Sequence, residues 1–477
     1  MPAPSIRQTE KLSATIEYMR ILFCCQFYAP SIGGVQEVMR QVAERLVLRG
    51  HEVTVATSWL PDRTSWIQNG VVIKDFAIAG SSVGGMQGDL AAYQKWVLSE
   101  SFDLVMINMA QQWTLDALIP VLKDVRGRKI LIPCGFSCLY EPSYAKYYRS
   151  MPEVLRRFDH LIFHSFDYRD IRFTKQHRIQ QVSVIPNGAS ETEFHVAKDR
   201  SFRQRLGISD DDWMFLTVGS FTLAKGHLDL VQAYLAADFL GKSSILLINA
   251  NFYRPEVDAS VSGSQNKIEG HFKEEISSES PVDTQDNGAQ GHNRLKKVWQ
   301  RITHRLVKRR QASRVVHFQR EFASAVEAVH RQDSKKRVLL VDLPREDLVQ
   351  AYMHADLFVF ASWIEYSPLV LFESAAAGTP FLSAQVGNAD EVARWTGAGV
   401  IGPSIVDAKG YTQIDLKRFA KQWSQLMQDK EGLRELGRNG KKNWAARFTW
   451  GRIVQEYEDV FQRVCAGASG VREGRRK

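Results

Sequence analysis

Two glutamates, Glu365 and Glu373, lie eight positions apart in the segment A-S-W-I-E-Y-S-P-L-V-L-F-E-S-A-A-A-G-T-P. A carboxylate suits vicinal hydroxyls, because each of its oxygens accepts a hydrogen bond. The largely apolar run from Asp356 to Ala361 predicts a buried strand. We therefore expect the first carboxylate on the loop that leaves this strand and the second on a following helix.

The start of that helix is predicted from its residue types. Ser367 is a favourable N-cap and Pro368 suits the first helical position, whereas Gly378 is typical of a helix end. The backbone N–H groups of Leu369 and Val370 would then be free at the helix N-terminus. Such a terminus favours an anion, for example a diphosphate.

The spacing of the two glutamates also has a plainer interpretation. Glu373 lies at most about 12 Å of helical rise beyond the loop, within reach of one nucleotide-sized ligand. Taken alone, however, the spacing favours an ordinary helix in which one glutamate is solvated and the other is buried and paired elsewhere.

A third candidate for chemistry is Lys225, in the segment V-G-S-F-T-L-A-K-G-H that follows a predicted strand. Group transfer from a diphosphate needs positive charge where negative charge develops on the leaving group. A lysine in a glycine-ended loop can supply that charge, although a solvated lysine is the more common case.

The elements that must position these residues form two series of apolar runs alternating with helical patterns. Such alternation predicts two Rossmann-like, doubly wound α/β domains facing a cleft, with ligands at the carboxyl ends of the strands. The expected strands are Ile21–Gln26, Val53–Thr57, Leu104–Asn108, Lys129–Pro133 and His160–His164 in the first domain, and Phe215–Gly219, Ser244–Asn249, Val338–Asp342, Asp356–Ala361 and Thr379–Ala384 in the second.

The glutamate segment resembles the signature of glycosyltransferase family 4, retaining enzymes of the GT-B fold. That signature is a strand, then E-x-(S/F)-(P/G)-L-V, then a Glu-bearing helix rich in small residues. Met19 to Ser58 resembles the family's first strand, glycine loop, helix and second strand, and V-I-P-N-G at Val184 to Gly188 its interdomain connection. Val218 to His227 resembles its donor-phosphate loop. These pieces occur in the family's order.

The resemblance implies roles for individual residues. Glu365 and Lys225 would be catalytic, with Glu365 at the donor sugar and Lys225 at the phosphates, and Glu373 would bind the ribose hydroxyls. The remaining donor-binding residues would be Gly33, Gly34, Ser220, Tyr366, Ser367, Leu369 and Val370.

Three positions depart from the family pattern. Ser220 stands where the family usually has an Arg, which clamps phosphate in a way that Ser cannot. Pro368 stands where many relatives have Gly. On the acceptor side, Cys134 and Gly135 in I-P-C-G-F-S occupy the place of a frequent His. For Ser220, either another basic residue substitutes for the Arg or donor binding is weaker. For Cys134, a different sugar or a different acceptor would fit the change.

The resemblance and the predicted strands together suggest domain boundaries. Residues 1–18 are expected to be a disordered extension, and 19–186 with the helix at about 452–466 form the N-terminal, acceptor domain. Residues 187–451 form the donor domain, and 467–477 a basic tail.

The donor domain is expected to carry an insertion at about 254–314. Its last part, 294–314, contains nine Lys and Arg and no acidic residue, with apolar residues at helical spacing, which predicts a basic amphipathic helix. This helix could contact anionic lipid, bind a polyanionic glycan or be a solvated addition. Phe318–Gln332 is expected to resume the domain's own helix.

Composition narrows the class of protein. With 477 residues, 24% charged and 44% hydrophobic, the chain is a globular protein long enough for two or three domains. The odd count of five cysteines, with Cys24 and Cys25 adjacent in a strand, favours a reduced, cytoplasmic protein. Cys134 and Cys138 are too few for a zinc site, and Asp210–Asp212 are expected to form a solvated turn.

Charge and hydropathy bear on location and partners. No apolar run approaches the roughly 20 residues of a membrane span, and the first twenty residues resemble no secretion signal. The net charge of +9 favours polyanionic partners or an anionic membrane surface. We therefore expect a cytoplasmic protein that can be peripheral on the membrane.

The resemblance to family 4 implies a retaining glycosyltransferase that moves a sugar from a UDP- or GDP-sugar to a glycan or lipid-linked acceptor, in polysaccharide or glycoconjugate biosynthesis, without a metal or other cofactor. The alternatives are a nucleotide-sugar epimerase or phosphorylase of the same fold, and a non-catalytic binding homologue. Nucleic-acid binding is disfavoured, because no aromatic platform or recognised module accompanies the basic residues.

Overall fold

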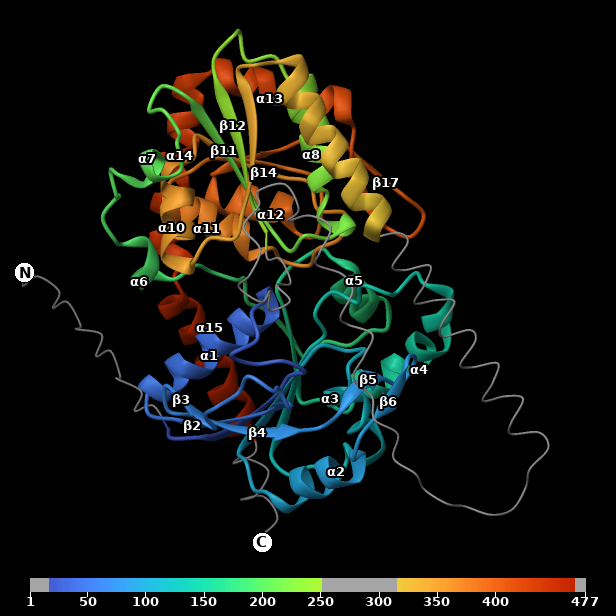
Figure 1. The fold of residues 1–477 in the computed structure, drawn as a ribbon. Coiled ribbons are helices and arrows are strands. Elements are labelled where there is room, and N and C mark those ends of the chain that lie inside the picture. The colour runs from blue at the N-terminus through green and yellow to red at the C-terminus, as the bar shows by residue number, and fades with distance from the viewer. Residues whose placement is uncertain (1–16, 251–314, 468–477) are drawn as a thin grey trace, which may run out of the picture. The chain divides into compact units, whose positions relative to one another are not determined.

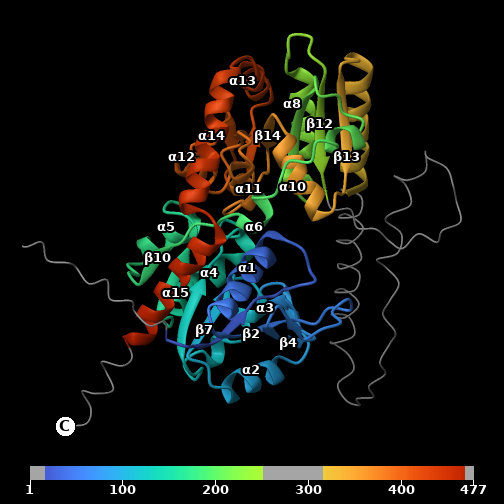
Figure 2. The same ribbon diagram turned by 90° about the vertical axis from the view of Figure 1, so that its left-hand side faces the viewer.

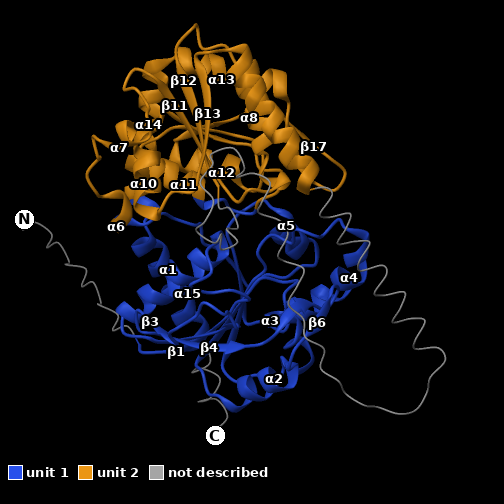
Figure 3. Ribbon diagram, viewed as in Figure 1, with its two compact units in different colours: residues 1–191, 366–369, 446–477 blue, residues 192–365, 370–445 orange. Residues whose placement is uncertain are grey.

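The computed structural model describes residues 17–250 and 315–467. The chain divides into two compact units, shown in Figure 3. Unit 1 comprises residues 1–191, 366–369 and 446–477, and unit 2 comprises residues 192–365 and 370–445. Each unit is described by itself below.

Several sequence predictions lie outside the described residues. They are nearly all of the extension at 1–18, the insertion at 254–314 with its basic helix at 294–314, and nearly all of the tail at 467–477. The helix expected at Phe318–Gln332 is within the described part, and residues 315–332 are helical.

Unit 1 is built on an eight-stranded sheet with the order β10-β9-β8-β7-β1-β2-β4-β3. Every adjacent pair is parallel except β3 and β4. The strands are β1 (Arg20–Cys24), β2 (Glu52–Ser58), β3 (Ile67–Gln68), β4 (Val71–Phe76), β7 (Leu104–Asn108), β8 (Arg128–Ile132), β9 (His160–Phe163) and β10 (Val182–Val184). A separate antiparallel hairpin consists of β5 (Ala79–Ser81) and β6 (Gly85–Gln87).

Helices cover both faces of this sheet (Figure 1). They are α1 (Gly34–Leu48), α2 (Leu90–Ser99), α3 (Trp113–Asp116), α4 (Ala145–Leu155), α5 (Arg169–Gln176) and the last helix, α15 (Trp450–Ala466), with short 3-10 turns at Ile119–Val121 and Pro142–Tyr144. The last helix packs against α1. Its buried Glu458 accepts hydrogen bonds from Arg49 and contacts buried His51.

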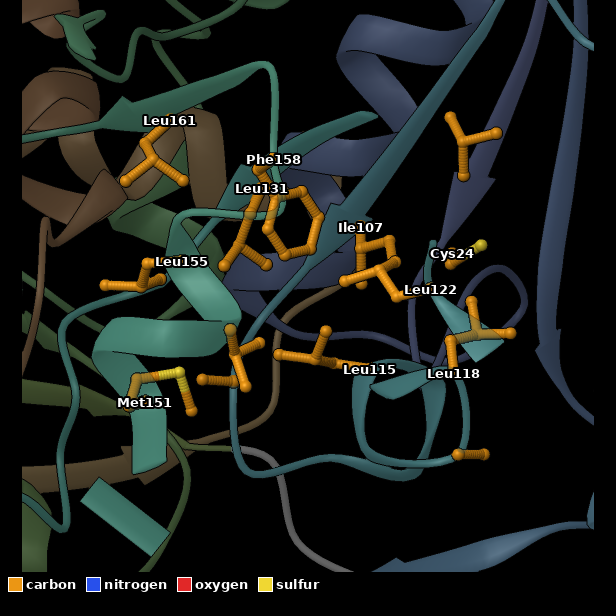
Figure 4. Close-up of a cluster of buried hydrophobic side chains, with 14 of the residues drawn as sticks. Cys24, Ile107, Leu115, Leu118, Leu122, Leu131, Met151, Leu155, Phe158 and Leu161 are labelled. Carbon is orange, nitrogen blue, oxygen red and sulfur yellow. The ribbon is translucent and has the colours of Figure 1, made fainter. Parts of the chain in front are cut away.

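The core of unit 1 explains why its strands are continuous apolar runs. Ile107, Leu131 and Leu161 of β7, β8 and β9 belong to one buried cluster with Met151 and Leu155 of α4 (Figure 4). All five side chains are buried. A parallel sheet covered on both faces needs apolar residues at successive positions rather than at alternate ones.

Unit 2 is built on a six-stranded, fully parallel sheet with the order β13-β12-β11-β14-β15-β16. Its strands are β11 (Trp213–Val218), β12 (Ser244–Asn249), β13 (Lys336–Val341), β14 (Leu357–Phe360), β15 (Phe381–Ser383) and β16 (Gly399–Ile401). An antiparallel hairpin, β17 (Ser404–Val406) and β18 (Thr412–Ile414), follows.

The helices of unit 2 again lie on both faces, and Figure 2 shows α12, α13 and α14 gathered on one side of it. Helix α13 packs against α8. Besides residues 315–332, the helices are α6 (Glu191–Phe194), α7 (Phe202–Arg205), α8 (His227–Ala236), α10 (Arg345–His354), α11 (Leu369–Ala377), α12 (Ala389–Thr396), α13 (Leu416–Gln428) and α14 (Lys430–Arg447), with a 3-10 turn, η3, at Leu223–Lys225.

The predicted fold class is confirmed: both units contain a doubly wound, mainly parallel sheet, and each of the ten expected strands is present with both ends within two residues of the prediction. The sequence did not predict the short strands at the sheet edges, β3, β10 and β16, nor β4 and the two hairpins. Among the described helices, none is long and apolar enough to cross a membrane.

Candidate active site

The sheet of unit 2 has a switch point between β11 and β14. From β11 the chain runs outward through β12 and β13, and then returns to the other side of β11 as β14. In open α/β sheets, ligands bind beyond the carboxyl ends of the strands at such a point. The two loops that leave it are 219–226 after β11 and the segment starting at Ala361 after β14.

A glycine lets these two loops approach each other closely. Gly226 ends the 3-10 turn and has φ +66°. A Cβ placed there would lie 2.0 Å from the carbonyl oxygen of Ala361. Only glycine therefore fits at this position.

Hydrogen bonds hold the loops in register. The carbonyl oxygen of Ala224 accepts from the backbone N–H of Trp363 at 2.8 Å, and Ser362 Oγ lies 3.1 Å from the same oxygen. The indole N–H of Trp363 donates to Asp229 Oδ2 at 2.6 Å, on the first turn of α8. Burial raises the pKa of Asp229 above its usual value. The β14 loop is thus fixed to the β11 loop through backbone and side chain.

The two residues predicted to be catalytic meet in this frame. Lys225 Nζ lies 2.5 Å from Glu365 Oε1, and Ser362 Oγ donates to the same carboxylate oxygen at 2.8 Å. The side chains of Lys225 and Glu365 are 28% and 16% exposed. A cation and a carboxylate are therefore held together at the switch point, accessible to a ligand.

The start of α11 differs by one residue from the prediction. The helix begins at Leu369, one position later than expected, and ends before Gly378 at φ +76°, as predicted. The N-cap prediction for Ser367 is wrong, because its Oγ is buried and has no hydrogen-bond partner. Ser367 instead contributes its carbonyl oxygen, which accepts from Asn187 Nδ2 at 2.9 Å.

Glu373 is buried in α11 and paired with a residue that the sequence did not point to. Arg345 donates to Glu373 Oε1 at 2.6 Å, and its two remaining contacts are with Glu193. This pairing matches the plainer interpretation of the spacing, in which the second glutamate is buried and paired elsewhere. Arg345 lies 28 positions before Glu373, and no local pattern connects them.

Ser220 is an exposed residue of the β11 loop. Its carbonyl oxygen contacts Nε2 of buried His227 at 3.2 Å. Burial lowers the pKa of His227 to about 4, so this imidazole is neutral near pH 7. The neutral histidine supports the loop rather than adding charge to it.

In unit 1, Gly33 and Gly34 follow β1, and α1 begins at Gly34. Gly33 has φ 172°, an extended conformation open to any residue, and a Cβ on Gly34 would meet nothing within 4 Å. No neighbouring atom among the described residues therefore excludes a larger side chain at position 34. That open space is compatible with close approach of a ligand.

Cys134 and Gly135 lie on the loop after β8, next to a buried carboxylate. The backbone N–H of Gly135 donates to Asp170 Oδ2 at 2.8 Å. Burial raises the pKa of Asp170 to about 6, and burial with the nearby Asp170 charge raises that of Cys134 to about 12. The Cys134 thiol is therefore protonated at neutral pH, which disfavours it as a nucleophile.

Tyr366 packs against the same loop, as part of unit 1. A Cβ on Gly135 would lie 2.9 Å from the Tyr366 ring. The Tyr366 hydroxyl accepts from the backbone N–H of His164 at 2.8 Å and hydrogen-bonds Asp170. Residues 366–369 group with unit 1, whereas the predicted boundaries place them in the second domain.

Two adjacent loops of unit 1 contain a concentration of left-handed residues that are not glycine. Met109 and Gln111 follow β7, and Cys134 and Phe136 follow β8, with φ between +48° and +71°. The backbone N–H of Met109 donates to a β8 carbonyl oxygen, that of Ile132, which places the loops side by side. Such strained positions often occur at functional sites. Sequence reasoning missed Met109 and Gln111, since residue type does not reveal a positive φ here.

Among the described residues, no three His, Cys, Asp or Glu side chains cluster in a way that could hold a metal ion. Asp210–Asp212 form a turn before β11, as expected. All five cysteines are unbridged.

Comparisons with known proteins relate both halves of the chain to sugar-transferring enzymes. The sequence profile of Glycosyltransferase Family 4 matches residues 32–193, and that of Glycosyl transferases group 1 matches residues 288–429. The two matches follow each other in the order of the two units.

Two curated relatives illustrate the range of similarity. D-inositol 3-phosphate glycosyltransferase of Nocardia farcinica is 30% identical over 146 residues, which cover 30% of this chain and 30% of that relative. N-acetyl-alpha-D-glucosaminyl L-malate synthase of Bacillus anthracis is 21% identical over 450 residues, covering 91% of this chain and 95% of the relative. The first similarity is local and the second extends over nearly the whole chain.

Solved structures show the same fold. Sucrose-phosphate synthase of Thermosynechococcus elongatus aligns with a TM-score of 0.65 and 16% identity, covering 94% of this chain and 99% of that one. The Anabaena protein HepE, solved in complex with UDP, aligns with a TM-score of 0.62 and 16% identity, covering 93% and 100%.

Proposed function

Because the chain belongs to glycosyltransferase family 4 and has the GT-B fold, we propose that it transfers a sugar from a UDP- or GDP-sugar to a glycan or lipid-linked acceptor. The observation that carries this proposal is the contact between Lys225 and Glu365 at the switch point of unit 2. A cation and a sugar-binding carboxylate, fixed by two loops, suit a donor with a diphosphate next to a sugar.

Relatives support a nucleotide donor. Structures of HepE contain UDP and, in another crystal, UDP-glucose, and a trehalose-6-phosphate protein of E. coli was solved with UDP-2-fluoro glucose. These proteins share the fold of this chain at 11–16% identity. We extend the nucleotide class, and no particular sugar, to this protein.

The proposed chemistry breaks the bond between the anomeric carbon and the diphosphate oxygen. The acceptor hydroxyl attacks that carbon from the face that the diphosphate leaves, and its proton passes to a departing phosphate oxygen, so the anomeric configuration is retained. Lys225 and the N–H groups of Leu369 and Val370 stabilise the charge that develops on the diphosphate. No covalent intermediate with the protein is needed.

Two alternative functions can be distinguished from sugar transfer by the reaction that each protein would carry out. A nucleotide-sugar epimerase of the same fold converts its donor without an acceptor, so incubation with donor alone distinguishes it. A non-catalytic homologue would bind the donor and show no turnover. The replacement of a family Arg by Ser220 is the observation that favours this second candidate.

The proposal is tested by thermal unfolding in the presence of UDP-, GDP- and ADP-sugars. A donor at 100 times its dissociation constant should stabilise the protein by about 2.7 kcal/mol. We expect a UDP- or GDP-sugar to raise the unfolding temperature and, with an acceptor, to yield a glycoside of unchanged anomeric configuration. No shift with any nucleotide sugar would contradict the proposal.

We also propose that the basic residues of 294–314 bring the enzyme to the anionic face of the cytoplasmic membrane, where a lipid-linked acceptor would be found. The support is the sequence alone, with nine Lys and Arg at 294–314. Co-sedimentation with vesicles containing phosphatidylglycerol should fall when 294–314 is deleted, and remain low for both proteins on phosphatidylcholine. Unchanged binding after the deletion would refute membrane contact by this segment.

A further inference from the structure

Arg345 connects two carboxylates of unit 2. Its NH2 atom donates to Glu373 Oε1 at 2.6 Å and to Glu193 Oε2 at 2.8 Å, while its Nε donates to Glu193 Oε1 at 3.1 Å. The contact with Glu193 is therefore the bidentate fork that fixes the plane of a guanidinium group. One edge of that plane then reaches Glu373.

The place of Arg345 in the fold is unfavourable without these partners. It is the first residue of α10, where the helix dipole disfavours a cation and where Glu346 and Asp347 are the more usual residue types. Its guanidinium carbon also lies 5.9 Å from the ring centre of Phe194. Glu193, Glu373 and Phe194 thus hold the arginine from three directions.

Glu373 is the most buried of the three charged side chains. Its side chain is 10% exposed, against 24% for Glu193 and 40% for Arg345. Burial of a carboxylate costs free energy unless hydrogen bonds or a nearby cation compensate for the lost hydration. A carboxylate has about four acceptor positions, so the bond from Arg345 and the interaction with the Tyr352 hydroxyl leave capacity for further hydroxyl donors.

We propose that Arg345 is a positioning residue for donor recognition: it holds the Glu373 carboxylate in the orientation that accepts hydrogen bonds from the ribose hydroxyls, and Glu193 orients Arg345 in turn. The inference rests on the proposed function, since it assumes a nucleotide donor. The buried ion pair between Arg345 and Glu373 would then be part of the nucleotide-binding site rather than a purely structural contact.

The test compares UDP with 2′,3′-dideoxy-UDP by titration calorimetry, in the full-length protein. Wild type should bind UDP at least about 10-fold more tightly, because hydrogen bonds to a charged group are lost with the hydroxyls. In Arg345→Gln the affinity for UDP should fall about 10-fold, with little change for the dideoxy nucleotide, so that the preference nearly disappears. If the wild type binds GDP rather than UDP, the corresponding guanosine pair is used.

Two further variants separate orientation from charge. Arg345→Lys keeps the charge and loses the fork, so it should give an intermediate preference. Glu193→Gln should also lower the preference, although Glu193 would not touch the nucleotide.

A matched control is Arg205→Gln. Arg205 likewise connects two carboxylates of unit 2, Asp199 and Asp347, and the second of these is on α10. This control should keep the full preference for the ribonucleotide. If removing any arginine that joins a carboxylate of α10 to a second carboxylate changed the preference, Arg205→Gln would show the same change.

Each other outcome has a separate meaning. Equal loss of affinity for both nucleotides in Arg345→Gln, or an unchanged preference, would overturn the inference and leave a structural ion pair. Equal binding of both nucleotides by the wild type would also overturn it, while the proposed function would stand. If neither UDP nor GDP binds the wild type, both the inference and the proposed function fail.

Discussion

Lys225 and Glu365 form a nearly neutral pair in a partly buried position, and this has a consequence for donor binding. The positive charge that a diphosphate would meet is already offset by the carboxylate. The Arg that the family usually adds is replaced by Ser220, so the β11 loop supplies no second guanidinium group. Removing the charge of Lys225 should therefore weaken UDP binding, whereas removing the charge of Glu365 should not weaken it.

We predict that Lys225→Met weakens UDP binding and that Glu365→Gln leaves it equal or tightens it. A partly buried ion pair contributes about 1 kcal/mol, which corresponds to about a fivefold change in affinity. Titration calorimetry of both variants checks the directions. Weaker binding in both would show that Glu365 supports the diphosphate site rather than offsetting its cation.

Asp170 gives a prediction about pH. Burial raises its pKa to about 6 in the folded protein, against about 3.9 when unfolded. The folded state then binds more protons between pH 4 and 6, so the contribution of Asp170 to the free energy of unfolding falls as pH rises through that window, by up to about 3 kcal/mol.

Denaturant unfolding of wild type and Asp170→Asn at several pH values measures this contribution. The stability of wild type relative to the variant should decrease from pH 4 to pH 6 and then level off. A difference that is constant with pH, or that grows, would show that the Asp170 carboxyl is not shifted upward.

Residues that belong to a local motif were predictable, and residues that act through distant partners were not. Lys225 and Glu365 stand in recognisable segments, and the structure brings them within 2.5 Å. Asp170 and Arg345 gain their importance from neighbours 35 and 28 positions away, for which one sequence holds no signal. Gln111 is singled out by its positive φ, which its residue type does not encode.

At the scale of elements, the site depends on two loops that touch at Gly226. The glycine has a positive φ and lies against the Ala361 carbonyl, so the 3-10 turn before it brings Lys225 beside the loop after β14. The loops are then held by the hydrogen bond from the backbone N–H of Trp363 to Ala224. Loop contact, rather than either loop alone, positions the pair.

We predict that Gly226→Ala lowers both stability and nucleotide affinity. A left-handed conformation costs an ordinary residue about 1–2 kcal/mol, and the contact with Ala361 adds to it. Gly207→Ala is the matched control, since Gly207 has φ +64° and open space around its Cβ position. Denaturant unfolding should show a larger loss for Gly226→Ala, and only that variant should bind UDP more weakly. Equal losses in the two variants would mean that the loop contact is unimportant.

The strands that the sequence predicted are those with a strong apolar pattern. Central parallel strands such as β7 and β12 are buried at every position, and their apolar runs stand out. The edge strand β16 is three residues long and only half-buried, so its pattern is weak. The N-cap at Ser367 failed for another reason: its side-chain oxygen is buried without a hydrogen-bond partner, which residue preference cannot anticipate.

At the scale of the whole molecule, both units repeat one scheme. Each sheet starts at a central strand, extends to one side and then returns to the other, which creates one switch point in each unit. Unit 2 presents the charged pair at its switch point, and unit 1 presents the Gly33–Gly34 loop together with the strained loop after β7.

We predict that the reaction does not depend on a metal ion. The charge of the leaving diphosphate is to be stabilised by Lys225 and the N-terminus of α11, both parts of the protein. The initial rate of transfer should be unchanged after dialysis against EDTA. A rate that falls and is restored by Mg²⁺ or Mn²⁺ would assign that stabilisation to a bound cation instead.

The most direct measurement is the rate of nucleoside diphosphate release from the donor that the thermal-unfolding panel selects, compared between wild type, Lys225→Ala and Glu365→Ala. Lys421→Ala, an exposed position on α13, serves as the control. We predict that the two site variants are slower by at least about 100-fold with unchanged unfolding temperatures, and that the control matches wild type. Site variants that release the nucleotide as fast as wild type would contradict the assignment of this pair as the catalytic centre.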